Sequence, residues 1–294
     1  MVNTAHLRAA SAPIKLGRYP SSIAISPDGR RAYVVTSGKG SVAVVDLASN
    51  RLVGSPIKIG RYPEGIAITP DGSRVYAVNH GNGSVSAIDA GTDEVVARIR
   101  VGRGPTAIGI SPDGTHAYVT NSRDGTVSVI DTASNAVAAA AIKVGRHPVA
   151  LAVAPDGRHV YVANISDDTV SVIRTATNRL SPRKIRTGDS PTALAISADG
   201  RRLYVANARE DTVSVISPRT GMPAAKAIRV GHRPTAIAIS PASNMAYVTG
   251  LGPGTLSVID TKTTRRVRRP IVVGPFPVAI AIGPNGRRVY IVHN

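Results

Sequence analysis

Four arginines stand at the same position of a short repeated loop, and the chemistry they offer is anion binding. Each follows the glycine of a Gly-x-x-Pro sequence; they are Arg18, Arg61, Arg103 and Arg146. A guanidinium is always charged and presents a planar fork of N–H donors that matches a carboxylate or a phosphate. Gathering like charges costs energy that a bound anion relieves. The sequence therefore predicts an anionic small molecule or an acidic macromolecule as the partner at these loops.

The other copies of this loop diverge, which favours an asymmetric pocket. Asp189, His232 and Pro275 replace the arginine. The position after it carries Tyr19, Tyr62, Gly104, His147, Ser190, Arg233 and Phe276. The aromatic rings could stack on a base or line an organic ligand. The predicted ligand-binding residues are Arg18, Tyr19, Arg61, Tyr62, Arg103, Arg146, His147, His232, Arg233 and Phe276. A second interpretation stays open, in which these are solvated turn residues copied by duplication.

Histidines in the same set of loops could support acid–base chemistry. A histidine beside a carboxylate can act as general acid or base near neutral pH. If the protein is an enzyme, the predicted catalytic residues are His147, His232, His80 and Glu64, and His293 belongs to the same face. Neither an H-x-x-x-H nor a G-x-S-x-G motif occurs, cysteine is absent, and no EF-hand spacing is found. The sequence predicts no metal site and no cofactor.

The chain is strongly basic. Lys plus Arg number 36 against 18 Asp plus Glu, a formal net charge of +18, whose field attracts polyanions. Two clusters stand out: Arg179, Arg183, Lys184 and Arg186, and Arg265, Arg266, Arg268 and Arg269. Such a basic rim fits either a solvated face that guards a sheet edge or a surface that holds nucleic acid through its phosphates, without base specificity.

All of these residues lie on a repeat of about 43 positions. The loop prolines are Pro20, Pro63, Pro105, Pro148, Pro191, Pro234 and Pro277, and the tyrosines Tyr33, Tyr76, Tyr118, Tyr161, Tyr204, Tyr247 and Tyr290 keep the same intervals. Each unit contains four strand-length segments, the first two joined by a turn that is Pro-Asp-Gly in its strongest copies. Repeats of this length with four strands are typical of propeller blades.

The fold class predicted is therefore all-β, a seven-bladed β-propeller of four-stranded antiparallel blades forming a single domain over residues 1–294. Small residues in the middle of each first strand fit the narrow space near the axis; they are Ala24, Ala67, Gly109, Ala152, Ala195, Ala238 and Ala281. Asn79, Asn121, Asn164 and Asn207 end second strands, where we expect them to favour left-handed turns. On the face opposite the Gly-x-x-Pro loops, four aspartates are expected to close turns; they are Asp46, Asp89, Asp131 and Asp260.

The seventh blade is predicted to combine both termini. Residues 3–17 align without gaps on residues 131–145, so Asn3 takes the place of Asp131 at the end of a third strand. About six residues, the bulk of that strand, have no counterpart. Two interpretations stay open: a start assigned too far downstream, or an edge that accepts a strand from another chain and so permits self-association.

The Tyr-Val-x-Asn sequences at residues 118–121, 161–164 and 204–207, with Pro-Asp-Gly before and Val-Ser-Val-Ile-Asp after, resemble the YVTN family of β-propeller repeats. The resemblance covers nearly the whole chain and implies the propeller fold. The family includes surface, periplasmic and DNA-binding members, and related propellers include lactonases and a streptogramin lyase, so the resemblance leaves the activity open.

The sequence leaves the compartment open as well. Residues 1–12 lack the apolar core of a secretory signal, and no window is apolar over the roughly 18 residues of a membrane span. As written, the chain is expected in the cytoplasm, although many relatives are exported.

Three functions follow as hypotheses. The first is a non-catalytic binding or scaffold propeller that engages an anionic partner at an arginine-lined channel mouth. The second is a lyase or lactone hydrolase with its site at the same mouth. The third is sequence-independent nucleic-acid binding.

Overall fold

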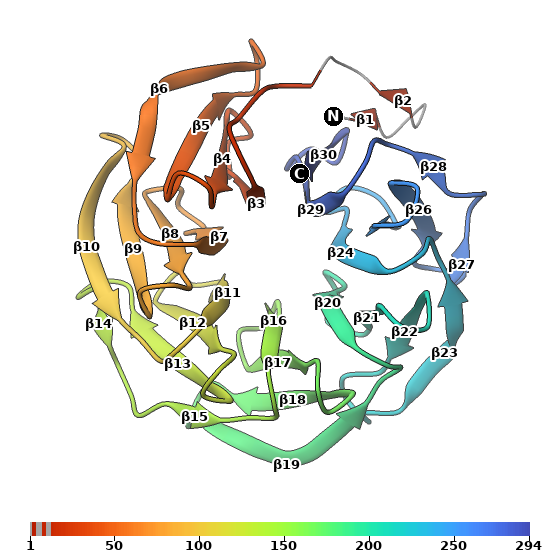
Figure 1. Cartoon of the computed structure of the whole chain (residues 1–294). Helices are drawn as coiled ribbons and strands as arrows, with labels where there is room; N and C mark the ends of the chain where they lie inside the picture. The colour runs from red at the N-terminus through yellow and green to blue at the C-terminus, as the bar shows by residue number, and fades with distance from the viewer. Residues whose placement is uncertain (1, 4–7, 10–12) are drawn as a thin grey trace.

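The computed structural model describes residues 2–3, 8–9 and 13–294 and confirms a β-propeller. Its strands form seven sheets arranged in a ring, with the first strand of each repeat innermost (Figure 1). Blade 1 contains β3 (Pro20–Ile25), β4 (Arg31–Thr36), β5 (Ser41–Asp46) and β6 (Arg51–Lys58). Blade 2 contains β7 (Pro63–Ile68), β8 (Arg74–Asn79), β9 (Ser84–Asp89) and β10 (Glu94–Arg100).

The next four blades repeat this antiparallel order. Blade 3 contains β11 (Pro105–Ile110), β12 (His116–Asn121), β13 (Thr126–Asp131), β14 (Ala136–Val137) and β15 (Ile142–Lys143). Blade 4 contains β16 (Pro148–Val153), β17 (His159–Asn164), β18 (Thr169–Arg174) and β19 (Arg179–Arg186). Blade 5 contains β20 (Pro191–Ile196), β21 (Leu203–Asn207), β22 (Thr212–Ile216) and β23 (Pro223–Arg229). Blade 6 contains β24 (Pro234–Ile239), β25 (Met245–Gly250), β26 (Thr255–Asp260), β27 (Arg265–Arg266) and β28 (Ile271–Val272).

The seventh sheet joins both ends of the chain, as predicted. It runs in the order β2 (Arg8–Ala9), β1 (Val2–Asn3), β30 (Arg288–His293) and β29 (Pro277–Ile282). Asn3 pairs with Arg288 in the register that pairs Asp46 with Arg31 in blade 1. The third strand of this blade spans two residues in the described part of the chain, whereas β5 spans six.

The ring closes through side chains as well as through the shared sheet. The Arg288 guanidinium donates to the Leu47 carbonyl of blade 1 at 3.3 Å. Tyr290 and Leu16 pack against the buried Ala32, Val45 and Leu47.

The apolar core lies between the blades. Along β8, Val75 and Ala77 pack with Tyr33 and Val35 of blade 1, while Tyr76 packs with blade 3. Because both faces of a blade are covered, the second and third strands carry nearly continuous apolar runs instead of alternating ones. Tyr76 is fully buried, and its β-branched neighbours suit the pleated surface.

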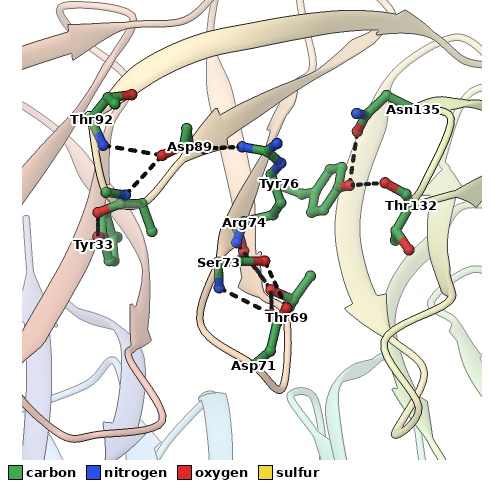
Figure 2. Close-up of polar contacts among 12 residues, drawn as sticks. Tyr33, Thr69, Asp71, Ser73, Arg74, Tyr76, Asp89, Thr92, Thr132 and Asn135 are labelled. Carbon is green, nitrogen blue, oxygen red and sulfur yellow. Dashed lines mark hydrogen bonds and ion pairs between the residues drawn. The ribbon is translucent and has the colours of Figure 1, made fainter.

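Aspartate side chains close turns between consecutive strands, as predicted. Asp71 accepts hydrogen bonds from the Thr69 hydroxyl at 2.5 Å and the Ser73 amide at 3.0 Å (Figure 2). Its turn ends in Gly72, whose φ of 75° requires glycine. The amides of Gly91 and Thr92 donate to Asp89 at 2.9 and 3.1 Å. These bonds fix the connections between consecutive strands.

Strand-two tyrosines link neighbouring blades. The Tyr76 hydroxyl of blade 2 lies 2.8 Å from Asn135 Oδ1 and 3.2 Å from the Thr132 carbonyl of blade 3 (Figure 2). Tyr33 and Tyr204 reach the carbonyls of Ala90 and Thr261 in the same way. Each of these hydroxyl groups therefore bonds the blade that follows.

The asparagines that end second strands have a different role from the one expected. None of them adopts a positive φ, and Asn79, Asn121, Asn164 and Asn207 are fully buried. The Asn121 amide donates to the hydroxyls of Thr126 and Ser128 on the third strand, at 3.0 and 2.9 Å. The prediction that these asparagines favour left-handed turns was therefore wrong. Their side chains instead connect the second and third strands of one blade.

No helix in the described ranges is long and apolar enough to cross a membrane.

We predict that Tyr76→Phe lowers the free energy of unfolding by about 1–2 kcal/mol, because the buried acceptors lose a hydroxyl partner. Tyr118→Phe is the matched control, since the Tyr118 hydroxyl, at the same position of blade 3, makes no hydrogen bond within the described residues. Denaturant titration of both variants checks this, and equal losses would contradict a role for the Tyr76 bonds.

Candidate functional site

The seven Gly-x-x-Pro loops lie on one face of the ring. In each, the residue before proline has a left-handed backbone; these are Tyr19, Tyr62, Gly104, His147, Ser190, Arg233 and Phe276. The carbonyl of that residue accepts an amide hydrogen bond from the loop after the second strand, as in His80 to Tyr62 at 3.1 Å and Ser37 to Tyr19 at 2.9 Å. The two sets of loops therefore border one mouth of the channel.

Two of the four mouth arginines are already paired with carboxylates. Arg103 Nε lies 2.6 Å from Asp124, and Arg146 Nε lies 2.6 Å from Asp167. The backbone N–H of each arginine, followed by its side chain, lowers the pKa of that aspartate. Each pair joins a Gly-x-x-Pro loop to the loop after the second strand of the same blade. Because the aspartate neutralises the arginine, less positive charge is left for a ligand.

Arg18 and Arg61 are arranged differently. Neither makes an ion pair with a described residue. Their guanidiniums lie over the adjacent rings, with Cζ 5.6 Å from the centroid of Tyr19 and 5.7 Å from that of Tyr62. A cation over a ring face is attracted to its quadrupole and keeps its charge. Of the four repeated arginines, those of blades 1 and 2 therefore keep the charge that an anion could use.

The predicted histidines fall into separate environments. His147 Nδ1 lies 2.7 Å from the Ser166 hydroxyl, and His293 Nδ1 donates to the Pro275 carbonyl at 3.0 Å. His232 Nδ1 lies 3.0 Å from Asp211, whose other oxygen accepts the Arg233 amide. This carboxylate contact braces an exposed loop like the arginine pairs of blades 3 and 4. The structure does not bring these three histidines together.

His80 and Glu64 do come together, where the loop after β8 meets the start of β7. His80 Nδ1 lies 3.4 Å from Glu64 Oε1, and no hydrogen bond satisfies this buried nitrogen within the described residues. The pair borders a cavity of about 690 Å³. Its lining comes from blades 1 to 4 and includes Ser21, Ser22, Ser37, Tyr62, Gly65, Thr106 and Val149.

Glu64 occupies a position that other blades use to hold the ring together. The residue after the loop proline donates a hydroxyl to the next blade: Ser21 to Pro63 at 3.2 Å, Thr106 to Pro148 at 3.1 Å, and Thr235 to Pro277 at 2.8 Å. An ionised carboxylate cannot donate, so Glu64 cannot make this bond. Its presence gives blade 2 a titratable group where neighbouring blades carry a structural hydroxyl.

The environment of Glu64 changes its acidity. Burial raises its pKa above the ordinary value of 4.5, and the electrostatic effect of His80 partly opposes this rise. The carboxyl keeps contact with solvent, since 42% of its side chain is accessible. A carboxylate with a raised pKa is a better proton acceptor at neutral pH. This pair can therefore do acid–base chemistry.

The serine and threonine residues that line the pocket were not predicted from the sequence. Ser21 donates both to Pro63 and to the Glu64 carbonyl at 3.2 Å, which fixes the backbone of the carboxylate residue. The available signal was the repeat itself, because four of the seven residues after a loop proline carry a hydroxyl, namely Ser21, Thr106, Thr192 and Thr235, and Glu64 is the one charged residue among the seven.

Two further observations concern other sites. A second cavity of about 630 Å³ at the seam of blades 7 and 1 is lined mainly by apolar side chains such as Ile14, Leu16 and Ile23, with no described carboxylate. No group of three potential metal ligands gathers within residues 2–3, 8–9 and 13–294.

Comparisons with known proteins bear on this geometry. The profile of the family "Lactonase, 7-bladed beta-propeller" matches residues 66–225, which is more than half of the chain. A comparison with curated proteins gave no match. The resemblance to YVTN repeats stays a prediction.

Solved structures share the fold. Kuenenia stuttgartiensis hydrazine synthase aligns with a TM-score of 0.80 and 21% identity, over 98% of this chain and 99% of the other. A functionally unknown protein from Desulfotomaculum acetoxidans aligns with a TM-score of 0.77 and 19% identity, over 95% and 91%. At these identities the likeness establishes architecture and nothing about activity.

We predict that Glu64→Gln stabilises the protein at neutral pH. A folded-state pKa above the unfolded value means that Glu64 contributes stability below the unfolded pKa and loses it as pH rises through the folded pKa. The melting temperature of the variant should exceed that of the wild type at pH 7 and match it near pH 3. Glu94→Gln, on the outer strand β10, is the control. A variant less stable than the wild type at pH 7 would contradict this account.

Proposed function

The chain belongs to the family of lactonase seven-bladed β-propellers, and from that premise we propose that it hydrolyses a small anionic lactone in the pocket of blades 1 to 4. One observation carries the proposal: the Glu64 carboxylate, with a raised pKa, lies beside the His80 imidazole in a cavity of about 690 Å³. Ligand pockets of several hundred cubic ångströms accept molecules of this size.

The proposed reaction needs only a base and a positioned ester. Glu64 accepts a proton from water while the water oxygen forms a bond to the lactone carbonyl carbon. The bond between that carbon and the ring oxygen then breaks, and the proton passes from Glu64 to the departing alkoxide. The product is a hydroxy acid, which ionises at neutral pH. His80 stabilises the Glu64 carboxylate, and Arg18 or Arg61 attracts the anionic group of the substrate.

Hydrolysis should depend on Glu64. Because positioned acid–base groups contribute about 10²–10⁴-fold to rates, Glu64→Gln should lower kcat/KM at least about a hundredfold. Proton release from a panel of five- and six-membered lactones, with and without an anionic group, measures this. Glu94→Gln should react like the wild type. The activity should fall at acid pH with a midpoint above 4.5, since Glu64 must be ionised. Wild-type rates in Glu64→Gln, or no lactone opened by the wild type, would reject the proposal.

A second candidate is binding of an anionic molecule without turnover, favoured by the arginines that carry no ion pair. Arg18→Ser/Arg61→Ser should weaken binding of citrate or inorganic phosphate about tenfold or more, because each charge-assisted hydrogen bond contributes about 1.5–3 kcal/mol. Arg103→Ser/Arg146→Ser should have a much smaller effect, since Asp124 and Asp167 already neutralise those groups. Titration calorimetry distinguishes the two pairs. Equal losses would indicate that all four arginines bind.

A further inference from the structure

The three exposed tyrosine and phenylalanine side chains of the described residues lie at one position of three consecutive blades. Tyr19 is 58% exposed, Tyr62 61% and Phe276 60%. They belong to blades 1, 2 and 7, whose inner strands β3, β7 and β29 are neighbours around the ring (Figure 1). All other tyrosines belong to second strands. We call Tyr19, Tyr62 and Phe276 the aromatic arc.

This placement is costly for the fold. The three residues have φ values of 56°, 48° and 47°, a region that glycine or asparagine adopts at less cost than a bulky side chain. Blade 3 uses Gly104 at this position. A turn without a ligand has no need of a ring there, so the aromatic side chains indicate a binding role.

The two tyrosine rings of the arc lie against the backbone of the loops after the second strands. A Cβ added at Gly81 would lie 2.8 Å from Tyr62 Cδ2, and one added at Gly38 would lie 3.2 Å from Tyr19 Cδ2. The rings therefore rest against backbone that only glycine provides. Because Arg18 and Arg61 add positive charge to the same two rings, each unit offers a flat surface beside a cation.

Charge divides the mouth into two halves. The loops after the second strands of blades 3 to 5 carry five acidic residues, Asp124, Asp167, Asp168, Glu210 and Asp211, against two arginines, Arg123 and Arg209, whereas those of blades 1 and 2 carry Lys39, His80 and Asn82 and no acidic residue. The half that contains the aromatic arc is thus positive, and Tyr62 also lines the pocket of Glu64. An anion is drawn to the same side as the rings.

We propose that the aromatic arc binds a planar ring that carries a negative charge, either an aromatic carboxylate or a nucleotide, and so determines which molecules reach the pocket. Ring stacking supplies affinity regardless of ring identity, and the arginines select the anion. Binding of the ring does not depend on the proposed function. Only the hydrolysis of a bound lactone at Glu64 rests on it.

The test compares ring-bearing and ringless anions by titration calorimetry. Benzoate and adenosine 5′-monophosphate are the ring-bearing probes, and acetate and inorganic phosphate are their ringless counterparts. The test variant is Tyr19→Gly/Tyr62→Gly/Phe276→Gly, because glycine accepts a positive φ and preserves the loops. The matched control is Ser190→Gly, at the same loop position in blade 5.

The wild type and the control should bind at least one ring-bearing probe more tightly than its ringless counterpart. The triple variant should lose about tenfold or more of that affinity, with ringless anions unchanged. Preference for one probe identifies the source of the ring. Equal binding of ring-bearing and ringless anions, or a triple variant that binds like the wild type, overturns the inference.

The same experiment separates this inference from the proposed function. Glu64→Gln should retain the ring preference. Ring binding without any lactone hydrolysis would reject the proposed function and keep the aromatic arc, whereas hydrolysis without ring preference would do the reverse.

Discussion

Packing between blades is the constraint on which the rest of the structure depends. Each blade presents two apolar faces, as Val75 and Tyr76 of β8 do toward opposite neighbours, and it can bury both only between two other blades. A closed ring satisfies this for every unit. Closure in turn brings seven loops, distant in the sequence, to a single mouth. The chemistry of that mouth follows from the geometry that buries the core.

The repeat made the fold and its turns predictable. A recurring turn such as Thr69 to Arg74 depends on residues a few positions apart, so its hydrogen bonds can be inferred locally. Alignment of the repeats also placed Asn3 at the end of the third strand of blade 7, where it pairs with Arg288 from the opposite end of the chain. Association through the short third strand of blade 7 stays a prediction.

The site was predictable only in part, because its properties depend on distances between loops. The four arginines were equivalent in the sequence, whereas in the structure Asp124 pairs with Arg103 and no acid among the described residues pairs with Arg61. His80 and Glu64 were among several candidates. His232 also lies beside a carboxylate, that of Asp211 at 3.0 Å, so the burial of His80 Nδ1 and the adjoining cavity distinguish the His80–Glu64 pair. Similarly, Asn121 was assigned to a turn because its burial against the third strand cannot be read from its neighbours in the chain.

The position after the loop proline has an implication for how such a protein can change. Seven equivalent copies of this position open toward one channel, and three of them, Glu64, Val149 and Val278, carry no hydroxyl while the ring stays closed. Three contacts between blades lack the hydroxyl hydrogen bond at this position, and the ring still closes. A duplicated blade can therefore acquire a reactive side chain there while the fold is preserved. Because the other copies of this position keep the ring closed, the side chain in one blade can change and take a chemical role.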